Sequence, residues 1–291
     1  MKNNKIVLIV LIPVFLQVGI FIILPIVGGF IISFMDYNPL REDNTFIMFD
    51  NYRILFSDAA FLQALTNTLL FVLITVTANM ILSLTLAQLI TTFRSNKTRS
   101  FFRMVFFLPC IAPMVATSVV WARSIYSVRN GLLNIFFNLF GSLGANWLGD
   151  PHTILGSIII FTLWADIGYN IILFSAGLDG IPAEFYEACK IDGANSFQRF
   201  FRITLPLLGR TFAFVIIMTL ISHFNMFAQF SEMVAKSSPQ NAGLVLTSYI
   251  YKTAFEYKNL GYASAISMAL FAIIMIITLV QQRLNRVDWE Y

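Results

Sequence analysis

The segment IPAEFYEACKIDGANSFQRFFRITLPLL, residues 181–208, stands between two long apolar stretches and carries the most informative pattern of the chain. Pro182 suits the first turn of a helix, and Gly193 is expected to end that helix with a positive φ or a close backbone approach. Ser196 can cap a second helix, and Pro206 is expected to kink the chain where it re-enters an apolar stretch. The segment therefore predicts a short helix-turn-helix lying against a membrane face.

The second helix of this segment allows a plainer interpretation. Phe197 and Phe201 belong to an aromatic stripe, and Arg199 and Arg202 lie on the opposite side of the helix. Such a pattern is typical of an amphipathic helix that only rests on lipid headgroups. Periodicity taken without other information favours this interfacial helix over a specific binding element.

The composition outside the segment is that of a membrane protein. Hydrophobic residues make up 58% of the 291 residues and charged residues 12%, about half of the charged fraction of a typical soluble chain. A soluble core of this size could not hide so many apolar side chains, so lipid must solvate them. The net charge of +4 does not point to nucleic acid, because the basic residues lie between apolar runs.

Apolar stretches long enough to cross a bilayer, which takes about 20 helical residues, occur six times. These windows are Ile6–Phe34, Ala64–Thr92, Phe101–Trp121, Ile154–Ala176, Thr211–Phe230 and Tyr262–Gln281. The first is too long for the apolar core of a signal peptide, and Pro13 and Pro25 are expected to kink it. The sequence therefore predicts an all-α integral membrane protein with six transmembrane helices and both termini on one side.

The distribution of basic residues predicts which side of the membrane each connecting segment faces. One set of connecting segments holds twelve: Lys2, Lys5, Arg94, Lys97, Arg99, Arg103, Lys190, Arg199, Arg202, Arg210, Arg283 and Arg286. The other set holds seven: Arg41, Arg53, Arg123, Arg129, Lys236, Lys252 and Lys258. Because basic loops stay in the cytoplasm, both termini and the segment 181–208 are predicted to be cytoplasmic.

The residues of the segment resemble a known family. Glu187-Ala188-Cys189, then Asp192-Gly193-Ala194 and Leu205-Pro206, are similar to the EAA loop of binding-protein-dependent ABC importer permeases, with Cys189 in place of the second Ala. An Asn67-Thr68 pair and the FFLP run at 106–109 resemble carbohydrate-type permeases of the maltose-permease class. The resemblance implies a type I permease core over residues 63–283, preceded by a helix and external loop at 1–62 and followed by a tail at 284–291.

What the resemblance implies about mechanism is specific. Glu187 to Ala194 would form a coupling helix that docks on a cytoplasmic ATPase, with Glu187 facing a basic residue and Ala188 and Gly193 permitting close approach. The expected partners are a second permease subunit (a heterodimer, with a homodimer as the runner-up), two ABC ATPases, an extracytoplasmic binding protein and a sugar or sugar-like solute. The family belongs to bacterial-type cytoplasmic membranes. This chain has no GxxxxGK[ST] loop, so ATP and Mg²⁺ are expected on the ATPases and neither a cofactor nor catalysis here.

Polar side chains inside the fourth window suggest where solute passes. Asp166 lies in the middle of the window, where a charged side chain costs about 3 kcal/mol. Thr162, Asp166 and Tyr169 recur at i, i+4 and i+7, so they share one helix face, and Asn170 lies beside them. Hydroxyl recognition suits such acceptors backed by an aromatic ring.

Thr219, His223 and Asn225 gather in the same way on the fifth window. In maltose-type permeases these two spans line the cavity, which makes all seven residues candidates for the substrate pathway. The alternative is that Asp166 and His223 pair with a partner subunit or hold helices together. An ion-driven secondary transporter is the rival function, but no internal repeat supports it. Cys110 and Cys189 have no metal-ligand spacing and are expected to be inert thiols.

Overall fold

A computed structural model describes residues 3–141, 144–234 and 241–284 of the chain. Its secondary structure is almost entirely helical, and η marks a π-helical turn. In chain order the elements are α1 (Asn3–Val18), η1 (Gly19–Ile23), α2 (Leu24–Ile32), β1 (Met35–Asp36), β2 (Thr45–Phe46), α3 (Asp50–Ser57), α4 (Ala59–Thr92), α5 (Asn96–Ile111), α6 (Met114–Val120), η2 (Trp121–Ile125), α7 (Leu132–Leu139), α8 (Ile154–Asp179), α9 (Ala183–Ile191), α10 (Ser196–Arg199), η3 (Phe200–Thr204), α11 (Leu205–Leu207), α12 (Gly209–Phe224), α13 (Ala228–Met233), α14 (Leu246–Tyr251), η5 (Lys252–Glu256) and α15 (Leu260–Leu284).

The helices that can cross a membrane match the predicted windows in number and order. Five are long and apolar enough to cross a membrane, and a bent pair makes the sixth when it is counted as one span. The five are Leu11–Ile32, Ala59–Thr92, Ile154–Asp179, Gly209–Met233 and Leu260–Arg283. The prediction of an all-α membrane protein with six spans is confirmed. The predicted tail, 284–291, lies outside the described residues except for the backbone of Leu284.

The third predicted window is not one continuous helix. α5 and the helical segment Met114–Ile125 meet at 90°, so the helix is interrupted inside the window Phe101–Trp121. The break lies at Ala112 and Pro113. Pro113 has no N–H to donate, and its ring pushes Ala112 out of the helical region, to φ −71° and ψ 140°. An apolar window cannot report such a break, because both halves have the same hydropathy.

Two other prolines are preceded by π-helical turns. η1 ends directly before the Leu24-Pro25 pair, with the Leu24 N–H donating to the Gly19 carbonyl. η3 ends directly before Leu205-Pro206 in the same way. A π turn shifts the hydrogen-bond ladder by one residue, which lets a helix continue past a proline that lacks a donor. Pro13, by contrast, lies inside α1.

The chain divides into two compact units. The first contains residues 1–62 and 246–273, and the second contains residues 63–245 and 274–291. In the first, β1 pairs antiparallel with β2, Met35 opposite Phe46. The Asp58 carboxylate of this unit accepts hydrogen bonds from the hydroxyls of Tyr249 (2.5 Å) and Tyr262 (2.6 Å). This carboxylate therefore joins the start of α4 to α14 and to α15.

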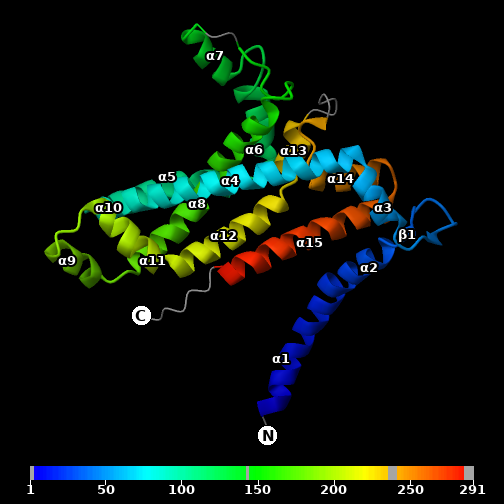
Figure 1. Ribbon diagram of the computed structural model, residues 1–291, viewed down its shortest axis with the longest axis horizontal. Helices are drawn as coiled ribbons and strands as arrows, with labels where there is room; N and C mark the ends of the chain where they lie inside the picture. The colour runs from blue at the N-terminus through cyan, green and yellow to red at the C-terminus, as the bar shows by residue number, and fades with distance from the viewer. Residues whose placement is uncertain (1–2, 142–143, 235–240, 285–291) are drawn as a thin grey trace. The chain divides into compact units, whose positions relative to one another are not determined.

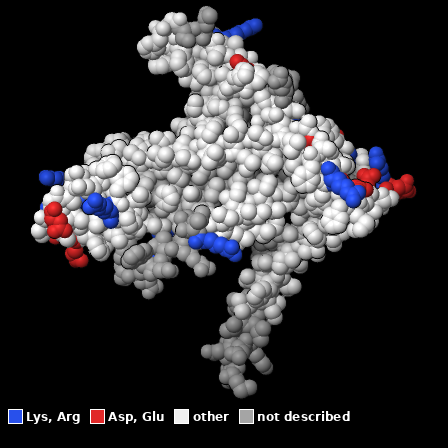
Figure 2. All heavy atoms as spheres, in the orientation of Figure 1, with Lys and Arg blue, Asp and Glu red and all other residues white. Residues whose placement is uncertain are grey.

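The second unit is built on α8, which packs along α5 and also contacts α12 (Figure 1). Gly168 lets α8 and α5 approach closely, because a Cβ at this position would collide with the backbone of Phe106. On the face drawn in Figure 2, charged side chains of this unit lie at the end formed by α9 and beside α7, whereas α4 and α12 show uncharged side chains. Exposed residues such as Leu73 and Ile81 on α4 suit contact with lipid.

Candidate functional site

Helix α9 and the turn after it form the first half of the predicted coupling loop. Asp192 is the C-cap of α9, and Gly193 follows with φ +72°. The Ala194 N–H donates to the Cys189 carbonyl at 3.0 Å, and the Gly193 N–H donates to the Lys190 carbonyl at 3.2 Å. These two bonds are a Schellman motif, which requires a left-handed residue at this position. The positive φ expected for Gly193 is confirmed.

The second half of the loop begins one residue earlier than predicted. Asn195, not Ser196, is the N-cap of α10. The Asn195 side chain accepts from the Gln198 N–H at 2.9 Å, and the Gln198 side chain accepts from the Asn195 N–H at 2.9 Å, a complete capping box. The Tyr186 and Thr204 hydroxyls lie 3.2 Å apart and link α9 to η3. The loop is therefore an ordered helix-turn-helix.

The surface of this loop is available to a partner. Glu187, Ala188, Asp192 and Gly193 are exposed, and Cys189 and Ala194 are partly exposed. Within this chain, a Cβ built on Gly193 meets nothing within 4 Å. Two large apolar side chains stand out beside it, Ile191 with 87% and Phe197 with 72% of their surface exposed. An exposed small-residue turn flanked by apolar side chains is suited to a close protein contact.

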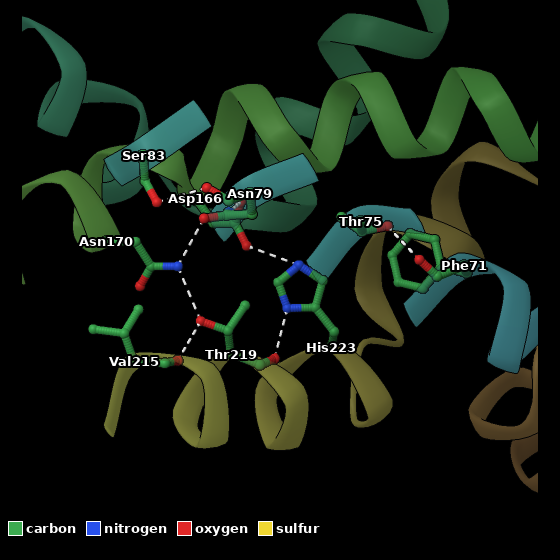
Figure 3. Close-up of polar contacts among 9 residues, drawn as sticks. All are labelled: Phe71, Thr75, Asn79, Ser83, Asp166, Asn170, Val215, Thr219 and His223. Atoms are coloured by element: carbon green, nitrogen blue, oxygen red, sulfur yellow. Dashed lines mark hydrogen bonds and ion pairs between the residues drawn. The ribbon is translucent and has the colours of Figure 1, made fainter. Parts of the chain in front are cut away.

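A second candidate site is a polar network among three spans (Figure 3). The Asn79 amide on α4 donates to Asp166 Oδ1 on α8 at 3.0 Å. The Asn170 amide on α8 donates to Asn79 Oδ1 at 2.7 Å and to the Thr219 hydroxyl on α12 at 2.9 Å. His223 Nδ1 lies 2.7 Å from the Thr219 carbonyl, and Nε2 lies 3.2 Å from Asp166 Oδ2. These contacts connect the five residues in a closed ring.

The ring requires one proton between Asp166 and His223. A backbone carbonyl only accepts, so Nδ1 of His223 must carry a hydrogen toward Thr219. In the neutral imidazole Nε2 is then an acceptor, and it faces a carboxylate oxygen that is also an acceptor. The pair is therefore either an imidazolium with a carboxylate or a neutral imidazole with a carboxylic acid. In both forms the pair has no net charge, which suits a position inside a membrane span.

The other predicted pathway residues do not join this ring. Thr162 is fully buried, and its hydroxyl has no hydrogen-bond partner among the described residues. Tyr169 is 48% exposed. Asn225 is exposed and donates to the Ile221 carbonyl at 2.7 Å. The stripe predicted from spacing thus runs from a buried end at Thr162 through Asp166, 24% of whose side chain is exposed, to an exposed end at Tyr169.

Asn79 is the member of the network that the sequence analysis missed. It lies in an apolar window with Thr75 and Ser83, and all three side chains have 0% exposure. Their spacing of i, i+4 and i+8 places them on one face of α4. A stripe of polar residues at this spacing inside an apolar window is the signal from which Asn79 could have been predicted.

Comparison with known proteins identifies the family. Residues 79–287 match the family model described as "Binding-protein-dependent transport system inner membrane component". The chain is 33% identical to the "Probable ABC transporter permease protein YurN" of Bacillus subtilis (strain 168), with 93% of each chain covered. It is also 30% identical to the "Arabinooligosaccharides transport system permease protein AraP" of the same organism, over 94% of this chain and 86% of that one.

The fold agrees with this assignment. The crystal structure of a bacterial alginate ABC transporter, in complex with alginate pentasaccharide-bound periplasmic protein, contains a chain with the same fold. The TM-score is 0.87 at 22% identity, covering 98% of this chain and 95% of that chain. The resemblance of Glu187 to Pro206 to an EAA loop pointed to the same family. This chain belongs to the family of inner-membrane components of binding-protein-dependent transport systems, and it is a non-catalytic permease subunit of an ABC importer.

Proposed function

We propose that this permease subunit forms one half of the path by which a sugar or short oligosaccharide enters the cell. Relatives over nearly the whole length are named for arabinooligosaccharides, diacetylchitobiose, starch degradation products and multiple sugars. Asp166 and Tyr169 supply a partly exposed acceptor and an exposed ring on one face of α8, which suits hydroxyl recognition. His223 positions Asp166 from α12, Thr219 holds His223 and Asn170, and Asn170 positions Asn79.

The proposal assigns the segment from Glu187 to Ala194 to coupling. Its turn is exposed, ordered by a Schellman motif and open around Gly193, and this is the single observation that most supports docking on a separate ATPase. Glu187 meets a basic residue there, and Ala188, Cys189, Asp192 and Ala194 complete the contact. The assembly comprises a second permease, two ATPases carrying ATP and Mg²⁺, and an extracytoplasmic binding protein. Both termini lie on the cytoplasmic side of the membrane.

The test uses the purified complex of this chain with its companion subunits in lipid. ATP hydrolysis is measured while neutral oligosaccharides, acidic oligosaccharides and amino acids are added together with the binding protein. A neutral or acidic oligosaccharide is expected to raise the hydrolysis rate. Stimulation by amino acids alone would contradict the sugar class, and uptake driven by an ion gradient without ATP would contradict the importer mechanism.

A further inference from the structure

The ends of three spans meet at one carboxylate next to the predicted coupling loop. Asp179 is the last residue of α8. Its Oδ2 accepts from Arg103 Nη2 of α5 at 2.7 Å, and its Oδ1 lies 3.7 Å from Arg99 Nη1. Arg99 also donates to the Thr91 carbonyl at 2.6 Å and to the Phe93 carbonyl at 2.7 Å, at the end of α4. We call these three side chains the Asp179 clamp.

The positive charges of Arg99 and Arg103 are both compensated by the Asp179 carboxylate. The Arg103 side chain is 26% exposed, and its Nε is buried with no hydrogen-bond partner among the described residues. The Arg99 side chain is 29% exposed and is held by the C-terminal carbonyls of α4, which a helix leaves without intrahelical partners. The Asp179 carboxylate, 40% exposed, compensates both charges at once. Losing it would leave two half-buried guanidinium groups close together.

The clamp lies directly before the coupling helix. Pro182, the N-cap of α9, follows Asp179 by three residues. The connection has no slack, because the Gly180 N–H donates to the Ala176 carbonyl at 3.1 Å and the Ile181 N–H to the Leu178 carbonyl at 3.2 Å. Figure 1 shows α9, the end of α8 and the start of α5 at the same end of this unit. A displacement of α9 is therefore passed to α8 at the residue that the clamp holds.

We propose that the Asp179 clamp makes α4, α5 and α8 follow the coupling helix as one body, so that Asp179, Arg99 and Arg103 are positioning residues for transport. The inference rests on the proposed coupling role of the loop and adds the residues that pass its movement to the spans. Farther along the helices, away from the clamp, a hydrogen bond from Asn79 to Asp166 ties α4 to α8 a second time. Two ties along paired helices resist sliding and rotation better than one.

The test measures transport per ATP hydrolysed by the reconstituted complex. Asp179→Asn keeps the shape and removes the charge, and it is expected to lower this ratio between about twofold and fivefold, the range that a partly exposed ion pair supports. Binding of the ATPase subunits in pull-down is expected to stay unchanged, and Asp179→Glu is expected to restore the ratio. The matched control is Asp50→Asn, which removes an exposed ion pair with Arg53 and should change nothing.

The outcomes separate the clamp from docking. An unchanged ratio in Asp179→Asn, or loss of ATPase binding in that variant, would overturn the clamp. Glu187→Lys serves as the docking reference, and if it binds the ATPase normally, the proposed role of the loop fails independently of Asp179. Should Asp179→Asn not accumulate in the membrane, Arg103→Lys, which keeps the charge but loses the guanidinium geometry, is read by the same two measurements.

Discussion

Among single residues, Asn79 and Asp166 occupy the same polar ring but differ in how much of their surface is exposed on this chain. Asn79 has 0% of its surface exposed, whereas 24% of the Asp166 side chain is exposed. The difference allows the proposed solute contact of Asp166 to be tested apart from a structural role of Asn79. Two substitutions separate these roles.

Asn79→Ala tests the structural role of the buried amide. It leaves Asp166 Oδ1 without the Asn79 donor and takes one of the two acceptors from the Asn170 amide, which keeps its bond to the Thr219 hydroxyl, and an unsatisfied buried polar group costs about 1–3 kcal/mol. The expected result is a lower unfolding temperature of the complex in detergent, with the solute concentration for half-maximal transport unchanged. A shift of that concentration without loss of stability would show that Asn79 is not merely structural.

Asp166→Asn keeps the ring and removes the carboxylate. The new amide can accept from Asn79 through its oxygen and donate to His223 Nε2 through its nitrogen, with no shared proton needed. Stability is therefore expected to remain close to that of the wild type. If the carboxylate contacts solute, the half-maximal solute concentration rises severalfold in transport assays. Unaltered transport would restrict Asp166 to holding helices together.

For the individual elements, the C-terminus of α9 allows the proposed docking on an ATPase to be tested at one residue. Gly193→Trp places a non-glycine residue at φ +72°, which costs about 1–2 kcal/mol, but its Cβ meets nothing within 4 Å in this chain. The variant is expected to insert in the membrane normally and to lose ATPase binding in pull-down. Gly193→Asn, which tolerates a positive φ and stays small, is the control and should bind. Equal binding by both variants would argue for a helix that only rests on lipid.

The start of α4 gives an element-level prediction about pH. Burial raises the pKa of the Asp58 carboxyl, but the hydrogen bonds from Tyr249, Tyr262 and the Ala60 N–H outweigh it, so the pKa lies below its ordinary value of 3.8. A lowered pKa contributes stability that is present above the ordinary value and is lost as the pH falls through the folded-state value. Unfolding temperatures measured in detergent should fall below pH 4 in the wild type.

A variant without the carboxylate isolates this contribution. Asp58→Ala removes the N-cap of α4, at a cost of about 1 kcal/mol, together with the acceptor of two hydroxyls. It is expected to be less stable at neutral pH and to show a smaller decrease on acidification. Tyr249→Phe, which removes one donor, should fall between the two. An acid response as large in Asp58→Ala as in the wild type would assign it to other groups.

For the chain as a whole, the predicted orientation rests on twelve basic residues in one set of segments against seven in the other. Lys97 and Glu256 are both exposed and lie in opposite sets. In a variant lacking Cys110 and Cys189, Glu256→Cys is expected to react with an impermeant thiol reagent in intact cells, and Lys97→Cys is expected to react only after lysis. The reverse pattern would invert the topology.

Local signals account for the part of the structure that was predicted correctly. Hydropathy over about 20 residues predicts each span, and Gly193 with its flanking residues predicts the turn after α9, because both depend on near neighbours in the chain. The errors also lie at short range. Asn195 and Ser196 are both good N-caps, and only the capping box with Gln198 chooses between them. Pro113 breaks a window that hydropathy describes as continuous.

The amino-acid sequence was sufficient for the membrane class, the six apolar windows and the family, because these follow from composition, periodicity and one motif. Tertiary packing decided which polar side chains meet. Asn79 and Asp166 are 87 residues apart, and Arg103 and Asp179 are 76 apart. Each side chain alone indicates only a polar group that needs a partner. The partner is chosen by the approach of α4, α5 and α8, which no local pattern encodes.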